Sequence, residues 1–197
     1  VDGRDARFFL RSTAERRKDL WALWEFFCMC ERCAARGDDT RQFPCACTPC
    51  MGFMMARNPR EWGQGDSWEM LPCGYCGFQA PREMQNAIFA RERSLGEKMQ
   101  EMYEAARARC GEKENEGELV KTSRALSRSV CAVRRHAHTI RAASLQYFVH
   151  RRAKDWYWAA LTQRTVLQGL RGIVDFPTAF EAHCWMLLGD ACSHQGG

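Results

Sequence analysis

The sequence lacks any long apolar run. Its richest stretch, Trp21 to Cys30, is short and contains Glu25, so it falls below the roughly 18 apolar residues that a membrane-spanning helix requires. The chain begins without the apolar core of a secretion signal, and its first residue is valine rather than methionine. We therefore expect no membrane contact, an intracellular location in the cytoplasm, the nucleus or both, and a chain that is a fragment of a longer protein.

Several well-known catalytic patterns are also missing. The sequence contains no Ser-His-Asp set, no phosphate-binding Walker loop and no glycine-rich dinucleotide fingerprint. The composition, with 46% hydrophobic and 27% charged residues, is typical of a globular protein, and the net charge of +5 is a mild basic bias that decides little. The strongest indication of a binding or catalytic site is therefore the residue type that is unusually frequent.

That residue type is cysteine. Of the 12 cysteines, eight fall between Cys28 and Cys76. Tight spacing without a secretion signal favours metal binding in a reducing compartment over a disulfide framework. No histidine lies in this window. Sites made only of cysteine thiolates are closed structural zinc sites, so we expect structural rather than catalytic zinc.

The spacing predicts two zinc sites. Two Cys-x-x-Cys pairs separated by 22 residues (51–72) predict one four-cysteine site, formed by Cys47, Cys50, Cys73 and Cys76. The pattern Cys28-x-Cys30-x-x-Cys33 supplies three ligands of a second site. Its fourth ligand is either Cys45 or a residue upstream of Val1; in the latter case Cys45 is a spare or peripheral thiol.

Composition divides the chain into three regions, 1–36, 37–80 and 81–197. The first holds a capping box, Ser12 to Glu15, and then a helix whose apolar face comprises Leu20, Leu23, Trp24 and Phe27. The second is rich in glycine and proline, with short strands at 52–55 and 68–71, and needs a metal to hold it together. The third predicts helices at 81–111, 119–136, 139–150, 155–170 and 175–192.

The predicted fold class is therefore mainly α. It combines an N-terminal helix, a small cysteine-rich region and a C-terminal helical domain of antiparallel helix pairs. Such pairs are compatible with a tetratricopeptide-like arrangement, although no clean 34-residue period is present.

The first region resembles a known family. Thr13-x-x-Arg16-Arg17-x-x-Leu20, followed by Trp24-x-Phe26 and the three-cysteine pattern, is similar to the post-SET segment of SET-domain protein-lysine methyltransferases, most of all the SET-and-MYND branch. The match is specific over 13–33, and some members of this branch have a further cysteine pair like that at 47–77. The branch also ends in a tetratricopeptide-like helical domain.

The resemblance implies a function. It implies methyl transfer from S-adenosylmethionine to a lysine of a histone or another protein, with Phe26 against the cofactor's adenine. The fourth ligand of the first zinc would then come from the SET core. Trp24 matches an aromatic position near the lysine channel that is usually tyrosine. The core's Asn-His-x-Cys motif and catalytic tyrosine strand are absent, so this chain is not catalytically complete alone.

The alternative interpretation is a non-catalytic module of zinc knuckles and helices that binds a protein or a nucleic acid. Between 121 and 154 the chain has nine lysines and arginines and no acidic residue, which favours contact with nucleic acid or an acidic partner. Glu97 to Glu118 are acidic enough to balance that charge if they pack nearby. We expect His136 and His138 at the surface, and Cys110, Cys131, Cys184 and Cys192 in or near the helical core.

Overall fold

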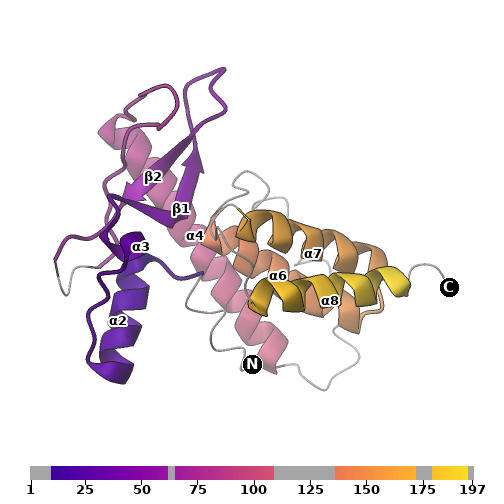
Figure 1. Ribbon diagram of the computed structural model, residues 1–197. Coiled ribbons are helices and arrows are strands. Elements are labelled where there is room, and N and C mark those ends of the chain that lie inside the picture. The colour runs from indigo at the N-terminus through magenta and orange to yellow at the C-terminus, as the bar shows by residue number, and fades with distance from the viewer. Residues whose placement is uncertain (1–9, 62–64, 109–135, 172–178, 195–197) are drawn as a thin grey trace.

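The computed structural model describes residues 10–61, 65–108, 136–171 and 179–194. The elements are α2 (Thr13–Trp24), α3 (Glu31–Ala34), β1 (Gly37–Pro44), β2 (Phe53–Arg57), α4 (Arg82–Ala108), α6 (Ala137–Arg152), α7 (Trp156–Leu170) and α8 (Ala179–Ser193). Figure 1 shows α2 and the small sheet at one end, α6, α7 and α8 at the other, and α4 extending between them. The mainly α prediction is confirmed. No helix in the described ranges is long and apolar enough to cross a bilayer.

Helix α2 begins as the sequence predicts. The Ser12 hydroxyl accepts a hydrogen bond from the Glu15 N–H at 3.2 Å, and the Glu15 carboxylate accepts one from the Ser12 N–H at 3.0 Å. This reciprocal pair is the predicted capping box. The helix ends at Trp24, where Glu25 takes a left-handed conformation with φ of 51°.

The buried face of α2 is the polar one, which corrects the sequence prediction. Thr13, Arg16 and Arg17 are buried, whereas Leu23 and Trp24 are 61% and 62% exposed. The arginines are buried because their guanidinium groups reach carbonyl oxygens of the neighbouring loops. The apolar side of the helix is left largely uncovered by the described residues.

The sheet is a single antiparallel pair. β1 and β2 align Phe43 with Met54 and Pro44 with Phe53, so β2 confirms the predicted strand near 52–55. The predicted strand at 68–71 is reduced to one bridge, between Ala56 and Met70. One face of the pair forms a small core with the first turns of α4; its buried members are Phe43, Met54, Ala56, Met70, Cys73, Ala80 and Phe89.

The C-terminal helices pack on one another. Apolar residues of α6, α7 and α8 share a core that includes Ile140, Val166 and Cys184, and Leu10 joins it from the start of the chain. The helices predicted at 139–150, 155–170 and 175–192 correspond to α6, α7 and α8, and α4 corresponds to the helix at 81–111. The helix predicted at 119–136 lies almost wholly outside the described residues, as do Cys110 and Cys131. Cys192 is exposed, contrary to expectation.

A buried charge network joins the sheet to the helices. Arg41 of β1 donates two hydrogen bonds to the Glu92 carboxylate of α4, at 2.7 and 2.6 Å, and His136 Nε2 lies 3.0 Å from the same carboxylate. Burial opposes the charge on Glu92, but the hydrogen bonds from Arg41 and His136 lower its pKa to about 2. His136 is therefore a buried link, not the surface residue that the sequence predicts.

Candidate metal centres

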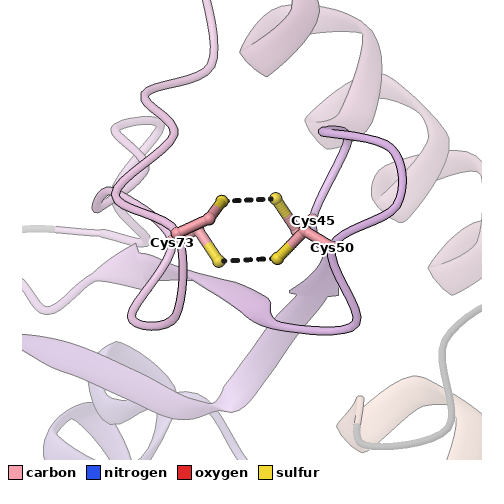
Figure 2. Close-up of side chains that lie close together, drawn as sticks. Cys45, Cys50 and Cys73 are labelled. Atoms are coloured by element: carbon pink, nitrogen blue, oxygen red, sulfur yellow. Dashed lines mark hydrogen bonds between the residues drawn. The ribbon is translucent and has the colours of Figure 1, made fainter.

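Four cysteine sulfurs meet beside the sheet. Cys45 follows β1, Cys50 precedes β2, and Cys73 and Cys76 lie in the turn before α4; we call them the four-sulfur group. Figure 2 shows the sulfurs facing one another across a small gap, with Cys45 Sγ 3.6 Å from Cys76 Sγ and Cys50 Sγ 3.8 Å from Cys73 Sγ. All four lie within 4.8 Å of one another.

These distances match a zinc site. Sulfurs bound about 2.3 Å from a zinc ion at the corners of a tetrahedron stand about 3.8 Å apart. A disulfide would bring two sulfurs to about 2.05 Å, and Cys45, Cys50, Cys73 and Cys76 are free thiols. The donor set and its spacing therefore fit Zn²⁺ in a closed structural site.

Backbone N–H groups point at these sulfurs. The Gly52 N–H lies 3.2 Å from Cys50 Sγ, and the Cys47 N–H lies 3.4 Å from Cys45 Sγ. Hydrogen bonds from the Cys76 and Tyr75 N–H groups lower the pKa of the Cys73 thiol to about 7. At Cys73 the turn thus favours the thiolate, the form of cysteine that binds metal.

Gly52 shows how tightly the loops close around the group. A Cβ at this position would lie 2.7 Å from Cys73 Sγ and 2.7 Å from the Tyr75 Cβ. Only glycine allows the loop after Cys50 to approach the turn at Cys73 this closely. The sequence places a glycine where the sulfurs need the space.

The grouping differs from the predicted one at one position. Spacing predicts Cys47 with Cys50, Cys73 and Cys76, whereas the structure brings Cys45 into the four-sulfur group in place of Cys47. The cause is the β1–β2 pairing, because the Cys45 N–H donates to the Gly52 carbonyl at 2.9 Å and fixes Cys45 where the loop between the two strands begins. Cys45 is consequently not available as the fourth ligand of the other predicted site.

The second group contains three sulfurs. Cys28, Cys30 and Cys33 lie between α2 and β1, with their sulfur atoms within 4.8 Å of one another; we call them the three-sulfur group. Within the described part of the chain, no fourth histidine, cysteine or carboxylate joins them at this distance. A tetrahedral zinc site here needs one more ligand.

Two arginines of α2 hold the loop that carries this group. The Arg17 guanidinium donates to the carbonyls of Cys28, Cys33 and Pro59, at 3.3, 3.0 and 2.7 Å. Arg16 lies 3.7 Å from Cys33 Sγ and also donates to the Thr13 hydroxyl. The polar side chains of the Thr13-x-x-Arg16-Arg17 pattern therefore position the three-sulfur loop.

The thiols of this group differ in pKa. Desolvation raises the pKa of Cys33 to about 11 despite the nearby Arg16, whereas Cys30, although burial opposes its charge, has its pKa lowered by hydrogen bonds from the Cys33 N–H and its neighbours. A bound divalent cation would remove this difference by stabilising all three thiolates.

An exposed apolar edge borders the three-sulfur group. Leu23, Trp24, Phe26 and Met29 are 52–63% exposed although each side chain is large and apolar. Phe26, the residue expected at a cofactor, lies just past the end of α2 and is more than half exposed. Large apolar residues that are exposed this close together in the sequence are typical of a contact surface in soluble proteins.

Comparison with known proteins does not place the chain in a family. A scan against protein-family models gave no match, and a search of the curated proteins found no significant relative. The chemistry of the two sulfur groups therefore rests on their geometry alone.

Proposed function

We propose that this chain is the zinc-binding and helical part of an S-adenosylmethionine-dependent protein-lysine N-methyltransferase. In this proposal the four-sulfur group holds one structural zinc ion and fastens the β1–β2 hairpin to the start of α4. The three-sulfur group holds a second zinc ion together with a ligand from elsewhere. Zinc supplies folding energy at such sites and takes no part in the methyl transfer.

The observation that carries the proposal is the three-sulfur group beside an exposed apolar edge. The site lacks one ligand, and the apolar residues from Leu23 to Met29 are exposed beside it. Another structural unit packed at this place would supply the ligand and cover these residues. In the family that the motif at 13–33 resembles, a SET core supplies both the fourth zinc ligand and the packing surface. Arg16 and Arg17 support the match, since their contacts explain why the motif places them before the cysteines.

The coding sequence upstream of Val1 tests the proposal directly. A SET core there, with an Asn-His-x-Cys motif and a tyrosine-bearing strand, supports the methyltransferase. An upstream sequence without that core would leave the alternative, a non-catalytic zinc and helix module whose exposed edge docks on another protein. Nucleic-acid binding through 121–154 stays a prediction, because residues 121–135 lie outside the described part of the chain.

A substitution at Phe26 tests the expected cofactor contact in the protein that contains the core. Phe26→Ala should raise the KM for S-adenosylmethionine at least about fivefold, because an aromatic contact with a purine is worth about 1–3 kcal/mol. The assay is transfer of a labelled methyl group to histones. Met51→Ala serves as the control, since Met51 is 90% exposed and lies outside the edge. Equal KM values for the two variants would remove Phe26 from the cofactor site.

A further inference from the structure

The four-sulfur group has a fifth cysteine beside it. Cys47 is half-buried in the turn that joins Cys45 to Cys50, and its carbonyl accepts a hydrogen bond from the Cys50 N–H at 2.7 Å. Its N–H lies 3.4 Å from Cys45 Sγ. Its thiol interacts with the thiol of Cys76 and, through charge, with that of Cys73. Cys47 is therefore in contact with the group without belonging to it.

Cys47 shares a neighbour with Cys45. Cys45 Sγ faces Cys76 Sγ, and Cys50 Sγ faces Cys73 Sγ. The thiol of Cys47 also interacts with Cys76, the sulfur that Cys45 faces. A thiol in this position is placed to take over the corner held by Cys45.

Both candidates satisfy the spacing that zinc requires. Two residues separate Cys47 from Cys50, as they do Cys73 from Cys76, and four separate Cys45 from Cys50. Zinc sites use pairs with two to four intervening residues. Chain geometry therefore permits either cysteine to chelate together with Cys50.

The structure has space beside Cys45 for its side chain to move away from the four-sulfur group. Cys45 and Ala46 line a cavity of about 510 Å³ between the end of β1 and α4. Cys45 is only half-buried, whereas Cys73 on the other side is 2% exposed. A displaced Cys45 side chain has space to turn into, which the buried ligand lacks.

From these contacts we propose that Cys47 is an alternative zinc ligand that replaces Cys45, so that five thiols share one four-coordinate site. This rests on the proposed zinc at the four-sulfur group. In the exchange the Cys47 thiol releases its proton to water and its sulfur binds the metal. The Cys45 sulfur leaves as a thiolate and takes up a proton, so the zinc keeps its charge and four sulfur ligands.

Cadmium NMR of the cadmium-loaded chain tests the exchange, because four-sulfur and three-sulfur coordination give different chemical shifts. Cys45→Ser and Cys47→Ser should each keep the four-sulfur signal, since either cysteine completes the site. The double variant should lose it. A three-sulfur signal at this site from either single variant would overturn the proposal. Absence of any cadmium at this site in the unaltered chain would instead contradict the proposed function.

Alkylation of the zinc-loaded, unaltered chain keeps the test independent of folding in the variants. Iodoacetamide should label Cys45 in some molecules and Cys47 in the others, because the thiol off the metal reacts and its partner stays bound. Tandem mass spectrometry locates the label. Labelling of Cys47 alone, of Cys45 alone, or of both cysteines in one molecule would each refute the exchange.

Discussion

Replacement of Arg17 by methionine should weaken metal binding at the three-sulfur group and leave the four-sulfur group unchanged. The guanidinium of Arg17 is buried and donates to three carbonyls, those of Cys28, Cys33 and Pro59. Methionine fills a similar volume but donates no hydrogen bond. The carbonyls on both sides of the cysteine loop would lose their partner.

The magnitude follows from those contacts. A hydrogen bond to a charged group contributes about 1.5–3 kcal/mol, and three such bonds in one network are not additive, so we expect a loss of about 3–5 kcal/mol. Two of the three bonds hold the cysteine loop in its ordered form, and the loop must order to bind metal. A loss of about 3 kcal/mol corresponds to roughly a hundredfold lower affinity.

Chelator competition followed by cadmium NMR measures the two sites separately. The three-sulfur signal of Arg17→Met should disappear at a chelator concentration roughly a hundredfold lower than in the unaltered chain, the ratio of the two affinities. Lys18→Met is the matched control, because Lys18 is the next residue of α2 and is exposed. If Arg17→Met and Lys18→Met release the metal at the same chelator concentration, the positioning role of Arg17 is wrong.

Three further predictions concern single sites. Gly52→Ala should destabilise the metal-loaded chain by at least about 2 kcal/mol in urea unfolding, because its Cβ would clash with Cys73 Sγ, whereas Gly74→Ala, with open space around it, should be tolerated. Leu23→Gln should change stability by less than about 0.5 kcal/mol, since the side chain is 61% exposed. Burial lowers the pKa of His138 from 6.5 to about 3, so on acidification the unfolded chain binds a proton at this residue before the folded chain does. The free energy of unfolding should therefore fall by about 1 kcal/mol between pH 6.5 and about pH 5.5, and His138→Gln should remove that dependence on pH.

Local sequence patterns were enough to predict the helices and most of the cysteines that form the two sulfur groups. The capping box at Ser12 and the helices α4, α6, α7 and α8 follow from signals within a few residues of each element. Six of the seven cysteines expected as ligands fall in the two sulfur groups. These are features that short-range spacing determines.

Which cysteine completes the four-sulfur group could not be predicted, because it depends on the pairing of β1 with β2. Spacing predicts Cys47 in the four-cysteine site. The hydrogen bond from the Cys45 N–H to the Gly52 carbonyl, made where β1 pairs with β2, places Cys45 there instead. A glycine two residues after Cys50 was the available signal. It indicated a close approach of the loop but did not identify the strand partner.

Burial of α2 was misjudged for a similar reason. A helical stripe of apolar residues normally faces the core. Here the carbonyls of the cysteine loop need donors, and Arg17 supplies them, so the polar face turns inward and Trp24 remains outside. His136 is buried because Glu92 and Arg41 complete a charge network that no local pattern of the sequence reveals.

Native mass spectrometry of the chain at neutral pH, with reductant present, tests the two metal sites most directly. We expect one zinc ion that survives a strong chelator and is lost in Cys73→Ala, and a second that is weakly held and is lost in Cys30→Ala. The weak second ion reflects the three-sulfur group without its fourth ligand. A chain that carries no zinc, or one whose tight ion survives Cys73→Ala, would contradict the proposed metal sites.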